Sequence, residues 1–252
     1  MSNAQPRFGS CCTSMLYTRD LERSRTFYDR WLPAWSFDTA TDDPRHITIR
    51  MGDQAVAHAR VVEGDGDEWV PMVRVADLEA SLVTATTIGA TIVDRDDIAG
   101  VARIARLRDL EGATFGLWQP SPDLGVAVTD VVGSLWWIEV LTRDPARAVQ
   151  FYSRLFGWQA RTTAFAPFDS YVVLERSGHQ EGGVLPIDPD WDVPPRWNTI
   201  VAVADADAAW REAASLGGCA HFAHTVPSAG RIAGVSDPGG AILIVRGPVP
   251  QP

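Results

Sequence analysis

Trp137 and Glu139 are the residues whose types and spacing most directly suggest a small-molecule site. They lie two apart in Trp136–Thr142, where aromatic and β-branched residues alternate as they do in a β-strand. Residues two apart on a strand project from the same face, so an indole ring and a carboxylate are expected side by side. An indole offers a flat apolar surface to a planar ligand. A carboxylate in apolar surroundings has a raised pKa and can act as an acid or a base.

Both residues also have a purely structural explanation. Trp137 can fill the core, which is the expected role of most of the ten tryptophans. Glu139 can be reached by solvent or held in a salt bridge, with Arg231 or Arg143 as its partner. The residues alone leave these alternatives open.

The histidines do not suggest a metal centre. His46, His58 and His179 are isolated in the sequence. His221 and His224 are three apart in a segment that we expect to be extended or a loop, and residues three apart on a strand face opposite sides. We therefore interpret the histidines as surface or hydrogen-bonded residues.

The three cysteines indicate reduced thiols. Cys11 and Cys12 are adjacent, Cys219 is distant, and no C-x-x-C pattern for zinc occurs. An odd number without framework spacing is typical of a reducing compartment, so we expect a cytoplasmic protein with small buried thiols. A nucleophilic cysteine is the less favoured alternative.

Composition excludes two classes of partner. The chain has 252 residues, 46% hydrophobic and 21% charged, with no apolar run of membrane-spanning length. Its net charge of −10 argues against binding nucleic acid, because such binding depends on Lys and Arg meeting phosphates. A neutral or cationic small ligand fits this charge, although solvated acidic faces explain it equally well.

A strand-turn-helix segment recurs along the chain at fixed offsets. Its fullest copy, Trp136–Trp158, combines the strand with Asp144 as a helix N-cap and Pro145 at the first helical position. An earlier copy lies 124 residues before it, so that Phe27-Tyr28 matches Phe151-Tyr152. Two further copies begin their helices at Asp77 and Asp205, which are 128 apart, and the endings that begin at Asp109 and Asp237 keep the same offset. These repeats predict four modules.

Each module is predicted to be a β-α-β-β-β unit. Four strands alone leave a sheet face uncovered, so two modules are expected to pair into an eight-stranded cup with helices outside. The sequence therefore predicts an α+β fold with two tandem domains, residues 8–120 and 133–248, joined by a proline-containing linker at 121–132. Because a tandem duplication can supply within one chain the contacts that single-domain proteins make by dimerising, we expect a monomer.

The repeated features resemble the vicinal oxygen chelate superfamily. The resemblance rests on Arg143-Asp144, the helix with Phe151-Tyr152, the closing Gly157-Trp158 and the ending Asp237-Pro238-Gly239-Gly240-Ala241, and it extends over about residues 10–246. That superfamily includes glyoxalase I, bleomycin-resistance proteins, fosfomycin-resistance enzymes and extradiol dioxygenases. Gly116-Leu117-Trp118-Gln119-Pro120 in particular looks like tandem glyoxalase-like proteins of actinobacteria.

The resemblance also identifies where metal ligands would stand. In metal-dependent members, one ligand lies on the first strand of a module, and the matching residues here are Thr13, Val70, Trp137 and Asn198. The matching last-strand residues are Gly116 and Ile244. Since none is a histidine or a carboxylate, the sequence predicts no metal and no other cofactor.

These matches place the predicted site in the second domain. If Trp137 stands at a ligand position of the family, Trp137 and Glu139 face into the cup, opposite Asn198 and Ile200. We therefore expect a metal-free protein of the bleomycin-resistance type that binds a planar aromatic natural product for sequestration or tailoring. The alternative is a glyoxalase-like enzyme, a lyase, dioxygenase or hydroxylase, with Glu139 as acid or base. The first domain has Thr13 and Met15 instead of Trp137 and Glu139, so its pocket is expected to be weaker or empty.

Overall fold

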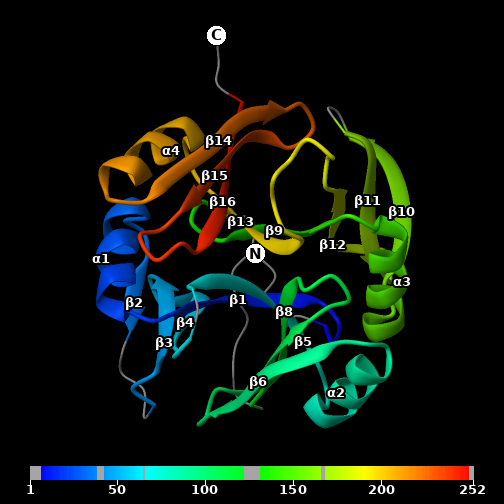
Figure 1. The fold of residues 1–252 in the computed structure, drawn as a ribbon. Helices are drawn as coiled ribbons and strands as arrows, with labels where there is room; N and C mark the ends of the chain where they lie inside the picture. Colours follow the sequence, from blue (N-terminus) through cyan, green and yellow to red (C-terminus); the bar gives the residue numbers. More distant parts are fainter. Residues whose placement is uncertain (1–6, 39–42, 65, 122–130, 166–167, 250–252) are drawn as a thin grey trace. The chain divides into compact units, whose positions relative to one another are not determined.

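Four β-α-β-β-β modules make up the computed structural model, which describes residues 7–38, 43–64, 66–121, 131–165 and 168–249 (Figure 1). The first two modules contain β1 (Cys11–Thr18), α1 (Leu21–Trp31), β2 (Ser36–Asp38), β3 (His46–Met51), β4 (Gln54–Val61), β5 (Glu68–Arg74), α2 (Leu78–Thr87), β6 (Thr91–Ile98), β7 (Ala102–Arg108) and β8 (Thr114–Pro120). The last two contain β9 (Leu135–Thr142), α3 (Pro145–Phe156), β10 (Gln159–Phe165), β11 (Phe168–Arg176), β12 (His179–Pro186), β13 (Arg196–Ala202), α4 (Ala206–Ser215), β14 (Cys219–Val226), β15 (Gly230–Ser236) and β16 (Ile242–Gly247). The predicted linker lies mostly outside the described residues.

The strands form two mixed eight-stranded sheets with the same topology. The first has the order β2-β3-β4-β1-β5-β8-β7-β6, and the second has the order β10-β11-β12-β9-β13-β16-β15-β14. Adding eight to each strand number of the first order gives the second, so the internal repeat extends to strand pairing. The predicted α+β fold with two eight-stranded sheets is confirmed.

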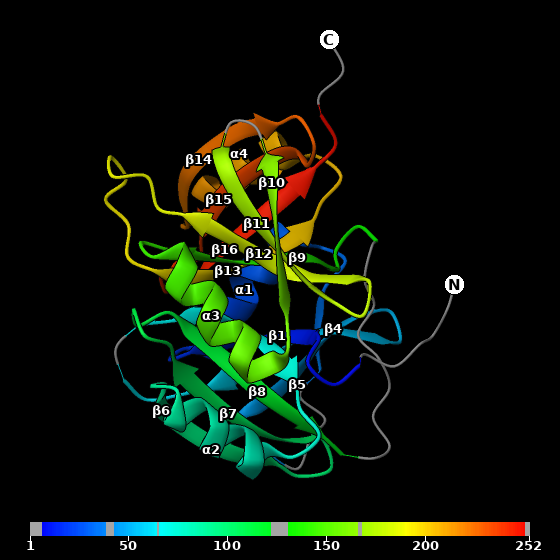
Figure 2. The ribbon, with the colours of Figure 1, turned by 90° about the vertical axis from the view of Figure 1, so that its right-hand side faces the viewer.

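The four helices in the described part of the chain begin as the sequence predicts. Asp20, Asp77, Asp144 and Asp205 each accept a hydrogen bond from the backbone N–H three residues later. Such a cap satisfies a helix N–H group that would otherwise lack a partner, and it stabilises a helix by about 1 kcal/mol. The helix α3 also ends as expected, at Gly157 in the left-handed conformation. Figure 2 shows α3 alongside β10.

The structure separates into two compact units whose boundaries differ from those of the sequence repeats. One unit comprises Met1–Cys12, Pro71–Val126 and Ile138–Asn198, and the other comprises Thr13–Val70, Ala127–Trp137 and Thr199–Pro252. The two sheets do fall within 8–120 and 133–248, but the compact units do not coincide with these ranges. The domain boundaries therefore stay a prediction.

The repeated tyrosines and aspartates explain how each unit is held together. In the first unit, the indole N–H of Trp197 donates to the Tyr152 hydroxyl at 2.7 Å, which donates to Asp109 at 2.7 Å. The second unit repeats the first of these bonds, from Trp69 to Tyr28 at 2.7 Å. Burial raises the pKa of both tyrosines well above its ordinary value, so the hydroxyls remain protonated donors. Each bond joins segments that are distant in the sequence.

No helix among the described residues has the length and apolar character needed to cross a membrane.

Candidate functional site

Glu139 on β9 lies at the centre of a cluster of polar side chains in the first unit. Its carboxylate accepts a hydrogen bond from the Tyr171 hydroxyl at 3.0 Å and a longer one from the Asn198 amide at 3.4 Å. Tyr171 is on β11 and Asn198 is on β13, so the cluster draws on three strands of the second sheet. Glu139 is half-buried, whereas Tyr171 and Asn198 are buried.

Arg196 fixes the orientation of the Asn198 amide. Its Nε donates to Asn198 Oδ1 at 3.0 Å, which leaves the amide nitrogen facing Glu139. The two hydrogen bonds that the carboxylate accepts, from Tyr171 and Asn198, both come from neutral groups. Glu139 forms no ion pair with any residue that the structure describes, and the expected partners bind elsewhere: Arg231 pairs with Asp207, and Arg143 donates to the Val193 carbonyl. The salt-bridge explanation with Arg231 or Arg143 is therefore wrong.

This environment favours the neutral form of the carboxyl group. Burial raises the pKa of Glu139 above its ordinary value, and the bonds from Tyr171 and Asn198 and the charge of Arg196 offset the rise only in part. Burial also lowers the pKa of Arg196, against the opposing effect of Glu139. A carboxyl group with a raised pKa and oriented neutral donors can accept a ligand hydrogen bond or exchange a proton.

The cluster lies on the face of β13 that is turned away from α3. Trp197 projects toward α3, since it donates to Tyr152 of that helix. Successive strand residues point to opposite faces, so Arg196 and Asn198 project from the other face. Figure 2 shows α3 and the strands β9, β12 and β13 from one side.

The structure brings together two of the four residues predicted for the site. Glu139 and Asn198 are hydrogen-bonded. Trp137 is half-buried beside Trp136, with ring centroids 6.3 Å apart, and Ile200 is buried and paired with Ile244. Trp137 and Ile200 belong to the other compact unit, so their part in a site stays a prediction.

Tyr171 and Arg196 are the members of the cluster that sequence reasoning missed. Arg196 is the first residue of β13. Tyr171 lies on β11, which β12 separates from β9. The available indication was Gly182-Gly183 in the middle of a strand, because glycine at such a position often marks a close approach by another group.

His46 and His58 correct the prediction that these histidines are isolated. They lie on the paired strands β3 and β4, and His46 Nε2 is 3.1 Å from His58 Nδ1, with stacked rings. Burial lowers the pKa of His46 to about 4 and that of His58 to about 3. Both rings are therefore neutral at pH 7, so one nitrogen of the pair can donate and the other accept. His221 and His224 have separate partners, Ser236 and Phe222.

The donor groups at the family's metal positions do not fit a divalent ion. Thr13 and Val70 are buried, Trp137 offers no ligand atom, and Asn198 Oδ1 is engaged by Arg196. Among the described residues, no group of three or more His, Cys, Asp or Glu side chains is placed to hold a metal. We therefore assign no step to a metal.

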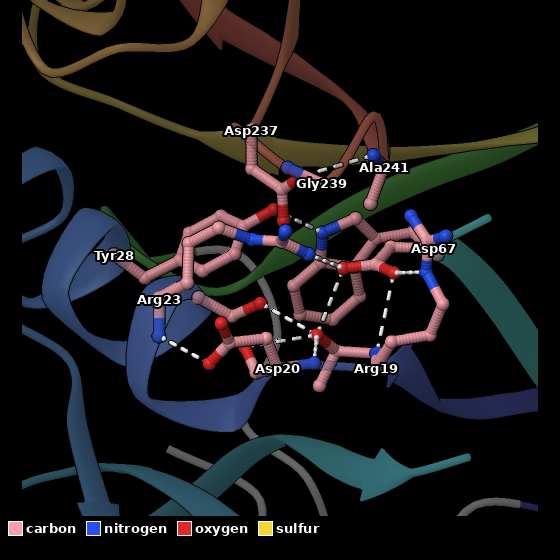
Figure 3. A network of polar contacts seen from close by, with 11 residues as sticks. Arg19, Asp20, Arg23, Tyr28, Asp67, Asp237, Gly239 and Ala241 are labelled. Atoms are coloured by element: carbon pink, nitrogen blue, oxygen red, sulfur yellow. Dashed lines mark hydrogen bonds and ion pairs between the residues drawn. The ribbon is translucent and has the colours of Figure 1, made fainter. Parts of the chain in front are cut away.

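A second polar cluster, in the other unit, is structural. Asp67 accepts bonds from Arg19, Arg23 and Thr18 at the start of α1 (Figure 3). Burial alone would raise the pKa of Asp67, but these bonds outweigh it and hold the pKa below its ordinary value. A Cβ on Gly239 would lie 2.0 Å from Asp67 Oδ2, so the glycine makes room for the carboxylate. Because both oxygens are engaged by cations, this cluster braces α1 rather than offering a binding group.

The two sheets of identical topology and the module repeat define a protein of the vicinal oxygen chelate type, and comparison with known proteins agrees. The family model for the glyoxalase/bleomycin resistance protein/dioxygenase superfamily matches residues 134–244. "Putative glyoxylase CFP32" of Mycobacterium tuberculosis is 32% identical over 250 residues, covering 94% of each chain. The chain belongs to this superfamily.

Other similarities are either shorter or lower in sequence identity. "Anthracycline biosynthesis protein DnrV" of Streptomyces peucetius is 30% identical over 178 residues, covering 69% of this chain and 63% of that protein. The Mn(II)-bound glyoxalase from Novosphingobium aromaticivorans superposes with a TM-score of 0.60 at 14% identity, covering 98% of this chain and 89% of the other. A catechol 2,3-dioxygenase gives a TM-score of 0.59 at 14% identity, covering 98% of this chain and 91% of the other. These two structures support the fold alone.

Proposed function

We propose that this protein binds a hydroxylated planar aromatic small molecule, and that Glu139 is the acceptor for a ligand hydroxyl. The observation that carries the proposal is the carboxylate of the half-buried Glu139, whose hydrogen bonds within the described part of the chain come from the neutral donors Tyr171 and Asn198. Each carboxylate oxygen can accept more than one hydrogen bond, so both retain capacity for a ligand donor. Sequestration of such a molecule is the role that this arrangement favours.

The comparisons support this class of ligand. One relative is by name an anthracycline biosynthesis protein, and anthracyclines are flat, hydroxylated aromatic molecules. Trp137, two residues before Glu139 on β9, is proposed to provide a stacking surface.

A second candidate function is acid–base catalysis on the same class of molecule. The raised pKa of Glu139 favours it, because a carboxyl group that titrates nearer neutrality can both accept and return a proton. In this role Glu139 would remove a proton from carbon or oxygen of the substrate, and Tyr171 would hold the carboxylate in place.

The test is binding of a dihydroxyanthraquinone probe, followed by quenching of tryptophan fluorescence. Wild type, Glu139→Gln, Tyr171→Phe and Asn198→Ala would be compared with Glu212→Gln, a surface variant on α4. We expect about tenfold weaker binding for Glu139→Gln and no change for Glu212→Gln. Equal affinity of the Glu139→Gln and Glu212→Gln variants would exclude Glu139 as the acceptor. Analysis of the bound probe for chemical change then separates binding from catalysis.

A further inference from the structure

Gly183 stands at a position in β12 where a glycine needs an explanation. Glycine in the interior of a strand is unfavourable, because it loses more chain entropy on folding and contributes no side-chain packing. Gly183 does not have a positive φ, so the backbone conformation does not require glycine there. A Cβ at this position would lie 1.7 Å from the Tyr171 hydroxyl oxygen and 2.3 Å from Cζ. The end of the tyrosine therefore occupies the space that a side chain at position 183 would need.

The strand order shows why this space matters. Tyr171 is on β11 and Glu139 is on β9, with β12 between them. In the strand pairing, Gly183 is the partner of Glu139 on one side and of Val173 on the other. The Tyr171 side chain must therefore cross β12 diagonally to reach Glu139, a path of about two strand spacings, or roughly 10 Å. A side chain on the intervening residue would block that path.

The first sheet provides a comparison within the same chain. His58 pairs with Met15 and with Thr48, as Gly183 pairs with Glu139 and Val173. His58 therefore corresponds to Gly183, and His46, two residues before Thr48, corresponds to Tyr171. Here the intervening residue has a side chain, and His46 bonds to it at 3.1 Å.

We propose that Gly183 is a positioning residue, which lets the Tyr171 hydroxyl cross β12 and hold Glu139 in the orientation that receives the ligand. The inference rests on the proposed function for its consequence in binding, but the positioning of Glu139 can be measured without a ligand. Tyr171 and Asn198 are the donors that the protein provides to Glu139, and the remaining acceptor capacity of the carboxylate is left for a ligand. By keeping this arrangement, Gly183 favours ligands that carry a hydrogen-bond donor.

The test is a ¹³C NMR titration of the Glu139 carboxyl group, assigned by comparison with Glu139→Gln. The Tyr171 bond lowers the pKa of Glu139 against the effect of burial, so losing the bond raises this pKa further. We expect Gly183→Ala and Tyr171→Phe to raise it by the same amount, and the double variant to add nothing to either. Affinity for a dihydroxyanthraquinone should fall about three- to tenfold in each.

Gly182→Ala is the matched control, since it adds the same methyl group one residue earlier. Its Cβ would meet Ile138 at 3.1 Å and not the tyrosine, so the Glu139 titration should not move. An unchanged titration in Gly183→Ala, beside a shifted one in Tyr171→Phe, would overturn the proposal. So would an unchanged titration in both, because the Tyr171 bond would then not act on Glu139.

A further variant covers the case in which Gly183→Ala does not fold. In a Tyr171→Ala background the ring is gone, so Gly183→Ala should fold and titrate as Tyr171→Ala does. Failure of that double variant to fold would overturn the assigned role. If the titrations behave as expected but Glu139→Gln binds the probe normally, the positioning stands and the proposed function fails.

Discussion

Corresponding positions on the two sheets differ in chemistry. The second sheet has a carboxyl group bonded by neutral donors, and the first sheet has a buried pair of histidines. The second sheet places Glu139, Tyr171 and Gly183 together, and Glu139 is half-buried. At the matching positions the first sheet has Met15, His46 and His58, which are at most 7% exposed. The histidines bond to one another, whereas Glu139 is bonded by neutral donors and keeps spare acceptor capacity. The same framework thus carries a closed polar pair in one half and a candidate binding group in the other.

The largest expected effect is the loss of folding stability when acid protonates the histidine pair of the first sheet. The ordinary pKa of histidine is 6.5, and His46 and His58 have folded-state values of about 4 and about 3. The folded state binds fewer protons in this window, so the stabilisation is complete above pH 6.5 and is lost as the pH falls toward 3. Each pKa unit corresponds to about 1.4 kcal/mol, so the pair contributes on the order of several kcal/mol.

Urea unfolding at pH 7 and pH 4.5 measures this loss. The double variant His46→Gln, His58→Gln does not titrate in this window and should lose much less stability than wild type between the two pH values. Asp43, whose pKa is held low by Arg45 and Arg60 against the effect of burial, also loses stabilisation in acid, but it does so in both proteins. Parallel losses in the two proteins would show that the pair is not neutral in the folded state.

The next largest expected effect tests the role of Glu139 on the second sheet. Glu139→Gln keeps the shape of the side chain and removes its charge. If Glu139 is a general base, probe binding persists and turnover falls by roughly a hundredfold or more. If it is only an acceptor, affinity falls about tenfold and no product forms with either protein. Product analysis by mass spectrometry, combined with binding titrations, distinguishes these results, and Met15→Leu at the matching position should change neither.

The modules were predictable because their determinants are local. An aspartate before the helix, Pro145 at its first position and Gly157 at its end act through neighbouring residues, and the fixed offsets identify the repeats. Glu139 and Asn198 could be predicted to share a face because strand alternation is equally local. Their hydrogen bond is consistent with that expectation.

The other partners of the site depend on strand register, which the sequence does not show. The pairing of β11 with β12 shifts between Leu174 and Glu175, and that of β3 with β4 shifts between Ile49 and Arg50. A shift of one residue changes which side chains share a face. The contacts of Tyr171 with Glu139 and of His46 with His58 therefore had to be found in the structure.

A third prediction concerns the aromatic surface expected beside Glu139. Removing one face of an indole from a ligand costs about 1–3 kcal/mol. Trp137→Ala should therefore weaken binding of a dihydroxyanthraquinone by roughly ten- to a hundredfold and leave the fold intact. Thr13→Ala, at the matching position of the first sheet, should leave affinity unchanged. Normal binding by the Trp137→Ala variant, or loss of binding in Thr13→Ala, would place the site elsewhere.

The smallest expected effect tests whether Glu139 changes folding stability with pH in the direction opposite to that of the histidines. Its pKa is raised in the folded state, so this state binds more protons than the unfolded chain above pH 4.5, the ordinary pKa of glutamate. The free energy of unfolding therefore falls as the pH rises through the raised pKa, opposite to the direction for His46 and His58. Glu139 is less buried than either histidine, so the effect should be smaller than that of His46 or His58.

Glu139→Gln measures that effect by urea unfolding at pH 4 and pH 7. The amide keeps a bond with Tyr171 and loses only the longer contact with Asn198, so the variant should be slightly more stable than wild type at pH 7 and not at pH 4. A variant less stable than wild type at pH 7 would mean that the ionised carboxylate stabilises the fold. Glu139 would then be a structural group like the histidine pair, and the contrast between the two sheets would disappear.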